Sequence, residues 1–334
     1  ATLEVARIRK ADGHIQDVRD RGNARGISFP SLQAGDIVDV QWRIESVPGS
    51  LPHVWTWWNF DVEGSPVEQS HLVLAHPKGM ALKEKIWGAV PAAAQSQKDD
   101  WMVREWRMHK LPALPSYEMA APVNDRARRV EFSNVPDWKA VVGWYLDLSG
   151  PLCRADEASR KKSLELTKGL TREEDKIAAI QRFVASGLRY QTTPFRNSAF
   201  VPTPSKEVLN EGFGDCKDKA ALICAMLDAL GIKAQIALVS TRSNGTHPHL
   251  PSPWFNHAIV KVDSSSGPLW IDGTVVQTDL RSLPQEDQQV PALIVDPSST
   301  GLTLTPLSAL KSNYTERRNI GKLDSQGNLE GHFG

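Results

Sequence analysis

The chain has 334 residues, of which 40% are hydrophobic and 23% are charged, and its 39 basic residues balance 39 acidic ones. This composition is typical of a globular protein of about two domains, and it lacks the basic excess that indicates nucleic-acid binding. No apolar run approaches the ~20 residues needed to cross a bilayer, so we expect no membrane-spanning segment, and no signal peptide is recognisable. A start at Ala1 without methionine is consistent with removal of an upstream segment.

The first half of the chain has the pattern of a β domain. Nine of the 11 tryptophans lie between Trp42 and Trp144, and the change in composition near residue 150 predicts two domains of different kinds. Alternating apolar residues broken by DG, PGS and HPKG turns predict an antiparallel β-sandwich over residues 1–148. The predicted strands are residues 3–9, 36–45, 54–62, 67–75, 80–89 and 101–109. We interpret the cluster Trp55, Trp57 and Trp58 as core rather than as a binding surface.

The segment that follows, residues 149–310, alternates helices and strands. Residues 136–149 are interpreted as a connecting segment with an apolar face, and a capping box of Thr171 and Glu174 is expected to open the second helix, which Gly187 stops. The predicted helices are residues 155–168, 171–186 and 205–210. The predicted strands are residues 188–191, 233–240, 255–262, 268–271, 293–295 and 302–304. Residues 241–253 are expected to form a mobile loop, and residues 311–334 the truncated start of a C-terminal β domain.

Residues 212–231, with the sequence GFGDCKDKAALICAMLDALG, combine a glycine-rich turn with a helix that carries a cysteine at its first position. We predict that Asp215 caps this helix and that Gly231 ends it. Unpaired N–H groups and the positive dipole end at a helix start favour a thiolate, which predicts a reactive thiol at Cys216. Lys217 and Lys219 are interpreted as solvated surface residues.

A base and an orienting group for this thiol follow in the sequence. His257 lies on a predicted strand, and Asp272 ends the next one; neighbouring antiparallel strands bring such residues side by side. Each residue alone has a simpler interpretation: a buried histidine, a turn-forming aspartate and a core cysteine. Their combination and order predict a Cys-His-Asp site.

These same segments, GFGDCKDKAALICAMLDALGIKA, WFNHAIVKV and LWIDGT, resemble the transglutaminase-like core of the papain-like cysteine enzymes. The resemblance is closest to bacterial proteins that carry an N-terminal β-rich domain of unknown function, and it covers about residues 150–310. It implies an α+β fold in which a helix bearing the cysteine packs on an antiparallel sheet bearing the histidine and the aspartate. It also implies Cys216 as nucleophile, His257 as base and then acid, and Asp272 as the orienting carboxylate. A location in the bacterial periplasm or cell envelope is implied by this resemblance alone.

Four further residues are weaker candidates for the site. By analogy the backbone N–H of Cys216 is the first donor of an oxyanion hole, and Tyr190 or Gln191 is a candidate for the second. Trp254 and Phe255, which precede the histidine strand, are candidate walls of a substrate cleft, with core packing as the alternative.

The sequence predicts neither a metal nor a cofactor. His247 and His249 lack a third ligand nearby, and nothing resembles the calcium sites of animal transglutaminases. The three cysteines contain no C-x-x-C pair, so we interpret Cys153 and Cys224 as inert thiols.

The expected activity is acyl transfer or hydrolysis at a peptide or protein amide, through a thioester on the cysteine. The motifs do not decide whether water or an amine accepts the acyl group. Hydrolysis or deamidation is the default expectation. Two alternatives remain at this stage: a catalytically silent module that binds a peptide or an envelope partner in the same cleft, and a cysteine peptidase. The motifs name no particular substrate and no oligomeric state.

Overall fold

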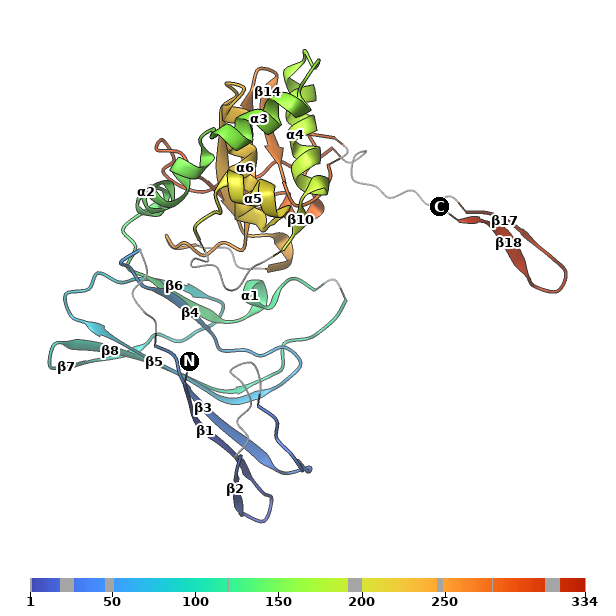
Figure 1. The fold of residues 1–334 in the computed structure, drawn as a ribbon. Coiled ribbons are helices and arrows are strands. Elements are labelled where there is room, and N and C mark those ends of the chain that lie inside the picture. Colours follow the sequence, from blue (N-terminus) through green and yellow to red (C-terminus); the bar gives the residue numbers. More distant parts are fainter. Residues whose placement is uncertain are drawn as a thin grey trace. The chain divides into compact units, whose positions relative to one another are not determined.

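The structure is a computed structural model, and it describes residues 2–18, 27–45, 51–118, 120–191, 200–244, 249–277, 279–309 and 319–333. The chain forms two compact units, Ala1–Pro52 and His53–Gly334. Both helices and antiparallel sheets are present, which confirms the predicted α+β class (Figure 1). The predicted domain limits at residues 148 and 310 stay predictions. Within the described ranges, no helix combines the length and the apolar character needed to cross a membrane.

The first unit is a three-stranded antiparallel sheet in the order β2-β1-β3. Its strands are β1 (Thr2–Arg9), β2 (Ile15–Asp17) and β3 (Ile37–Arg43). One face of β1 buries Ala6 and Ile8 against Val18. The predicted strands at residues 3–9 and 36–45 are confirmed, and β2 is an additional short strand.

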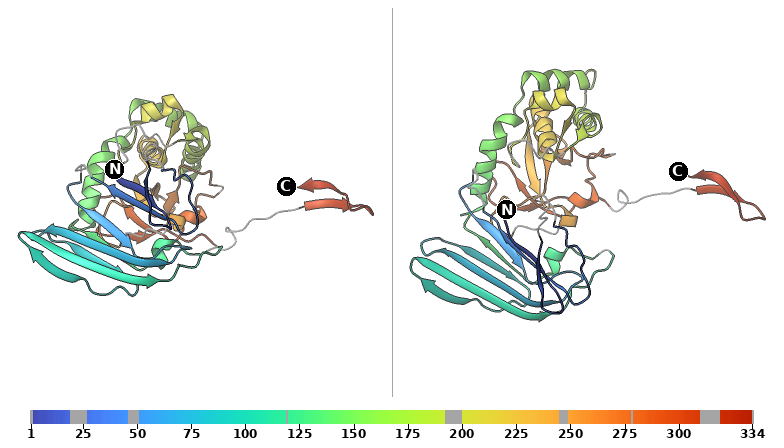
Figure 2. Two further views of the ribbon diagram at one scale, coloured as in Figure 1. Left: turned by 90° about the horizontal axis from the view of Figure 1, so that it is seen from below. Right: turned by 60° about the horizontal axis from the view of Figure 1, so that its bottom comes forward.

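The second unit begins with two three-stranded antiparallel sheets, β4-β9-β6 and β5-β8-β7 (Figure 2). The elements are β4 (Trp55–Asn59), β5 (Val67–Pro77), β6 (Lys83–Trp87), β7 (Ala94–Lys98), β8 (Trp101–Leu111), α1 (Val123–Arg126) and β9 (Arg129–Ser133). Residues of both sheets share one core, namely Phe60, Trp106, Met108, Leu111, Val130 and Phe132. The interpretation of the tryptophan cluster as core is wrong for Trp57 and Trp58, which are 38% and 41% exposed. Trp106 fills the core instead, because it points inward from the long strand β8.

Helices follow from residue 138 onward. They are α2 (Trp138–Ser149), α3 (Glu157–Leu166), α4 (Glu173–Gly187), α5 (Ser205–Glu211) and α6 (Cys216–Asp228), with the 3₁₀ turn η1 (Gly150–Cys153) after α2. The connecting segment at residues 136–149 is thus a helix, which the Asp137 side chain caps by accepting from the N–H of Ala140.

The capping box that was predicted for α4 is wrong. The helix begins at Glu173, and its N-cap residue Arg172 makes no side-chain cap hydrogen bond. Glu174 accepts hydrogen bonds from the side chains of Ser266 and Arg281, both at 2.6 Å. Because the Glu174 carboxylate binds these tertiary partners, it makes no local cap at the start of α4.

The helices lie beside a five-stranded antiparallel sheet in the order β14-β13-β12-β15-β16 (Figure 1). Its strands are β12 (Ala234–Val239), β13 (His257–Ser264), β14 (Gly267–Ile271), β15 (Pro291–Ile294) and β16 (Thr303–Leu304). Two 3₁₀ turns, η2 (Arg242–Asn244) and η3 (Gln285–Asp287), and a short parallel pair of β10 (Arg189–Tyr190) and β11 (Phe213–Gly214) complete this region. The hairpin of β17 (Asn319–Leu323) and β18 (Leu329–Phe333) is confirmed, and its role as the start of a further domain stays a prediction.

Helix α6 is the centre of this region because it is buried on nearly all sides. Every residue from Asp218 to Leu227 is buried, and α6 packs on β12, β13 and the helices α3, α4 and α5. A helix that is apolar all round belongs in a core, and its position fixes where its first residue lies relative to the sheet.

One glycine permits the close approach between α6 and the end of β14. A Cβ on Gly273 would lie 2.9 Å from Ile223 Cδ1, 3.2 Å from Lys219 Cβ and 3.4 Å from Val184 Cγ1. We expect Gly273→Ala to lower the free energy of unfolding by about 1–3 kcal/mol, the usual cost of overpacking a core. Urea unfolding of the wild-type protein and the variant measures this difference in the free energy of unfolding. The matched control is Gly301→Ala, where a Cβ meets nothing within 4 Å; an equal loss in both variants would contradict the packing argument.

Candidate active site

Helix α6 begins at Cys216 because the residue before it caps the helix. The Asp215 side chain accepts hydrogen bonds from the backbone N–H groups of Lys217 (3.1 Å) and Asp218 (3.3 Å). The Asp218 side chain in turn accepts from the N–H of Asp215 at 3.1 Å, which completes a capping box. The predicted cap and helix start are confirmed, and the Cys216 thiol lies at the positive end of the helix dipole.

Two glycines shape the turn that leads to this cysteine. Gly212 ends α5 with a φ of +70°, a left-handed conformation that favours glycine. A Cβ on Gly214 would lie 2.9 Å from the Cβ of Asp218. Gly214 therefore allows the chain to pass close to the side chain of Asp218, whose carboxylate completes the capping box.

The interpretation of Lys217 and Lys219 as solvated is wrong. The Lys217 side chain is 14% exposed and forms an ion pair with the capping aspartate. Lys219 is fully buried, and its Nζ donates to the carbonyl oxygen of Leu188 at 2.9 Å. Burial lowers the pKa of Lys219, and the negative charge of Asp272 acts in the opposite direction. A lysine at this place ties α6 to the end of α4.

The parallel pair β10 and β11 brings Tyr190 and Gln191 to the cysteine. Tyr190 pairs with Gly214, and the backbone N–H of Gln191 donates to the carbonyl of Gly214 at 3.1 Å. Burial, together with the charge of Cys216 and a hydrogen bond to it, raises the pKa of Tyr190 to about 12. Tyr190 is 49% exposed, so its ring also faces solvent. Tyr190 thus interacts electrostatically with the thiol, whereas Gln191 is anchored through its backbone.

His257 and Asp272 come from neighbouring antiparallel strands. His257 is the first residue of β13, Asp272 directly follows β14, and the pairing of the two strands begins at Val260 and Ile271. The Nε2 atom of His257 lies 3.2 Å from Oδ2 of Asp272. Asp272 is buried, and the His257 side chain is 13% exposed. The structure therefore brings these two residues together as the strand pattern predicted.

The charge on this pair is set by several hydrogen bonds. Asp272 accepts from the backbone N–H of Thr274 at 2.7 Å and from its hydroxyl at 2.8 and 2.9 Å. Burial alone would raise the pKa of Asp272, but hydrogen bonds from His257 and Thr274 outweigh it and lower that pKa. Burial likewise acts to lower the pKa of His257, and hydrogen bonds to Asp272 and Cys216 overcome it and raise this pKa to about 10. The imidazole is therefore held in its protonated form at neutral pH, between the thiol and the carboxylate.

Two buried glutamines fix the backbone around the carboxylate. The Gln181 amide on α4 donates to the carbonyl oxygens of Asp272 (2.8 Å) and Val275 (2.6 Å). The Gln277 side chain accepts from the N–H of Asp272 at 2.8 Å. Sequence reasoning missed both residues; a glutamine on the apolar stripe of α4 was the available signal for Gln181.

A further carboxylate, which sequence reasoning also missed, lies beside the pair. His257, Asp272 and Asp287 offer ligand atoms that all lie within 4.8 Å of one another. It is the one group of three such residues among those that the structure describes, and two of its members, His257 and Asp272, are already hydrogen-bonded to each other. Asp287 belongs to a run of polar residues, QEDQQ, in which no periodicity marks a buried position.

The segment before β13 contacts the sheet of β4, β6 and β9. Trp254 packs against Trp57, and the ring of Phe255 lies 6.2 Å from that of Trp138. Both candidate wall residues therefore pack on other aromatic side chains, and their role in a cleft stays a prediction. The ring of His249 packs at a tilt against that of Trp87, with a centroid distance of 4.1 Å; the other histidine of the predicted loop, His247, lies outside the described residues.

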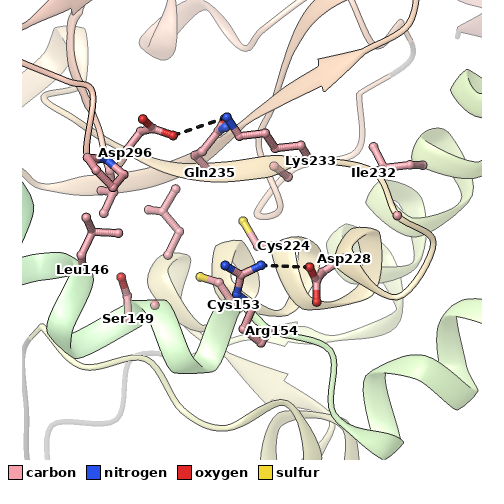
Figure 3. Close-up of a pocket in the computed structure, with 16 residues that line it drawn as sticks. Leu146, Ser149, Cys153, Arg154, Cys224, Asp228, Ile232, Lys233, Gln235 and Asp296 are labelled. Carbon is pink, nitrogen blue, oxygen red and sulfur yellow. Dashed lines mark hydrogen bonds and ion pairs between the residues drawn. The ribbon is translucent and has the colours of Figure 1, made fainter.

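A cavity of about 370 Å³ lies at the opposite end of α6, away from Cys216 (Figure 3). Cys153 and Cys224 both line it, beside the ion pair of Arg154 and Asp228. A hydrogen bond from Cys153, followed by burial, raises the pKa of the Cys224 thiol. This keeps Cys224 in the less nucleophilic thiol form, in line with its interpretation as an inert residue.

Comparisons with known proteins address the family and the fold. Residues 160–272 match the family model of the transglutaminase-like superfamily, and residues 3–115 match DUF3857, a domain of unknown function with a solved structure. No curated protein matches the chain. A crystal structure of a "putative protease" from Parabacteroides distasonis has 19% identity and a TM-score of 0.71, which shows a shared fold. The match covers 92% of this chain and 62% of that one, so this chain spans less than two thirds of that protein.

Two other solved structures are similar over a smaller part. A "putative cysteine protease" from Cytophaga hutchinsonii has 13% identity and a TM-score of 0.31, with 66% of this chain and 71% of that chain covered. The periplasmic domain of TgpA from Pseudomonas aeruginosa has 16% identity and a TM-score of 0.29, with 69% and 86% covered. The family models are the stronger finding: residues 160–272 match a transglutaminase-like domain, and a match to DUF3857 precedes that segment.

Proposed function

We propose that this protein is a cysteine enzyme that attacks peptide or protein amides and forms a thioester on Cys216. The observation that carries the proposal is the capped start of α6, where the cysteine interacts with the bonded pair of His257 and Asp272. A nucleophile, a base and a group that orients the base are the three parts that this chemistry requires.

The reaction begins with the Cys216 thiolate, which the imidazolium of His257 and the helix start both favour. The thiolate attacks the carbonyl carbon of a carboxamide and forms a C–S bond. His257 then gives its proton to the nitrogen of the leaving ammonia or amine as the C–N bond breaks. This step leaves an acyl thioester on Cys216 and a neutral imidazole on His257.

The second half of the reaction releases the acyl group. Neutral His257 accepts a proton from water, and the resulting hydroxide attacks the thioester carbonyl. The C–S bond breaks, the acid is released and the thiolate returns. An amine in place of water gives transamidation, so the acceptor decides between the two outcomes.

The oxyanion of each tetrahedral intermediate needs two donors. The backbone N–H of Cys216 is one candidate, because the first N–H groups of a helix point out of its start. The Tyr190 hydroxyl is the stronger of the two side-chain candidates, because it interacts electrostatically with Cys216 while its ring is partly exposed. The description of the Parabacteroides distasonis protein as a protease favours a backbone amide as a second candidate substrate.

The reactivity of Cys216 can be tested without knowing the substrate. We expect iodoacetamide at pH 7 to label Cys216 at least tenfold faster than Cys153 and Cys224, because the other two lack an imidazolium partner. Peptide mapping by mass spectrometry measures the three rates. Equal labelling of all three cysteines in the folded protein would contradict the proposed nucleophile.

The reaction itself can be identified from its products. We expect incubation with a library of glutamine-containing peptides to give deamidated peptides, each heavier by about one mass unit, as hydrolysis of a thioester predicts. Fragments in the mass spectra would indicate a peptidase, and joined peptides a crosslinking enzyme. The control is Cys216→Ala, which is expected to abolish every product; products that persist in this variant would rule out the cysteine mechanism.

A further inference from the structure

Asp287 is a buried carboxylate that the proposed reaction does not use. It is the last residue of η3 and is 2% exposed. One of its oxygens lies within 4.8 Å of both a ring nitrogen of His257 and an oxygen of Asp272. Two buried carboxyl groups therefore lie beside the imidazole.

The backbone around Asp287 is held firmly. The N–H of Asp287 donates to the carbonyl of Pro284 at 3.0 Å, and its own carbonyl accepts from the hydroxyl of Thr305. The Gln288 amide donates to the carbonyl of Leu283 at 2.6 Å. These bonds keep the Asp287 side chain in the interior and prevent it from turning to solvent.

The hydrogen bonds of the two carboxyl groups are unequal. Asp272 accepts from His257 and from Thr274. In contrast, Oδ2 of Asp287 is buried and accepts no hydrogen bond among the described residues. Two ionised carboxylates in contact repel each other, and one proton between them converts that repulsion into a hydrogen bond. The proton belongs on Asp287, because Asp272 has the donors that stabilise a negative charge.

We propose that Asp287 is a positioning residue that carries a proton and donates it in a hydrogen bond to Asp272, which leaves His257 beside a single negative carboxylate. This inference rests on the proposed function, since it assigns a positioning role at the same site. While Asp287 is protonated, His257 faces one negative carboxylate. Once Asp287 ionises, His257 faces two, and its imidazolium form becomes more stable.

The charges around Asp287 agree with this assignment. Burial, followed by the negative charge of Asp272, raises the pKa of Asp287 to about 7, and His257 acts in the opposite direction. Glu286 adds a further negative charge on the same turn, although it is exposed and accepts from the N–H of Ser243. On the neighbouring elements, Arg242 donates to the carbonyl of Gln288, and Lys219 interacts with Asp272.

The sign of the pH dependence follows from the raised pKa. The folded pKa of Asp287 lies above its ordinary value of 3.8, so the protonated acid stabilises the fold at low pH. That contribution is lost as the pH rises from about 4 to about 7, because the unfolded acid ionises near 3.8 and the folded acid near 7.

The test compares the wild-type protein with Asp287→Asn, in which an amide donor replaces the acid and cannot ionise. Glu286→Gln is the matched control, because it removes one charge from the same turn without contact to Asp272. The thermal unfolding midpoint of each of the three proteins is measured from pH 4 to 8.

The thermal unfolding midpoint gives a readout that does not depend on the proposed function. We expect the unfolding midpoints of Asp287→Asn and wild type to be equal at pH 4, and that of Asp287→Asn to be about 3 °C higher at pH 8, because it avoids a second buried charge. Equal pH profiles in these two proteins, or the same change in Glu286→Gln, would overturn the proposal. If Cys216 fails to react ahead of the other cysteines while the stability difference appears, the proposed function fails and the assignment of the proton stands.

A measurement on the wild-type protein needs no variant. In protein labelled with ¹³C at the aspartate carboxyl carbons, one resonance is expected to titrate near pH 7 and the great majority below pH 5. Titration of every aspartate resonance below pH 6 would overturn the proposal, whether or not Asp287→Asn folds.

Discussion

The contact between His257 and Asp272 is the interaction on which the candidate site depends. It spans 3.2 Å between two neighbouring strands, and both side chains are largely withdrawn from water. Burying a carboxylate and an imidazolium costs free energy unless each has a partner of opposite charge and further hydrogen bonds. Thr274 supplies those bonds to the carboxylate, and Gln181 and Gln277 hold its backbone. Removal of one partner would leave the other charged and unpaired in the interior.

The same arrangement explains why α6 is so deeply buried. A thiol at a helix start is useful only if the helix cannot move relative to the sheet that carries the base. Packing on all sides of α6, the close approach at Gly273 and the buried bond from Lys219 to Leu188 together fix that distance. The negative charge of Asp272 acts to raise the pKa of both Lys219 and His257, which opposes the effect of their burial. Stability and chemistry thus depend on the same few buried polar groups.

The sequence predicted the parts of this region that follow from local pattern. The cap at Asp215, the helix after it and the strands that carry His257 and Asp272 all have short-range signals, and the structure has them in place. The errors concern tertiary contacts. Glu174 binds Arg281 and Ser266 and makes no local cap. Lys219 is buried because it lies one turn before Ile223 on an apolar helix face. Asp287 could not be predicted, since a polar 3₁₀ turn contains no sign that tertiary packing will bury one of its carboxylates.

The central claim is that Cys216 forms the covalent intermediate, and trapping that intermediate tests it most directly. p-Nitrophenyl acetate, a reactive ester that needs no specific recognition, is mixed with the protein, quenched in acid after a few seconds and mapped by mass spectrometry. We predict one acetyl group on Cys216 that neutral hydroxylamine removes, as a thioester requires, and its loss in His257→Ala. Acetylation confined to Cys153, Cys224 or lysine side chains of the folded protein would contradict the account.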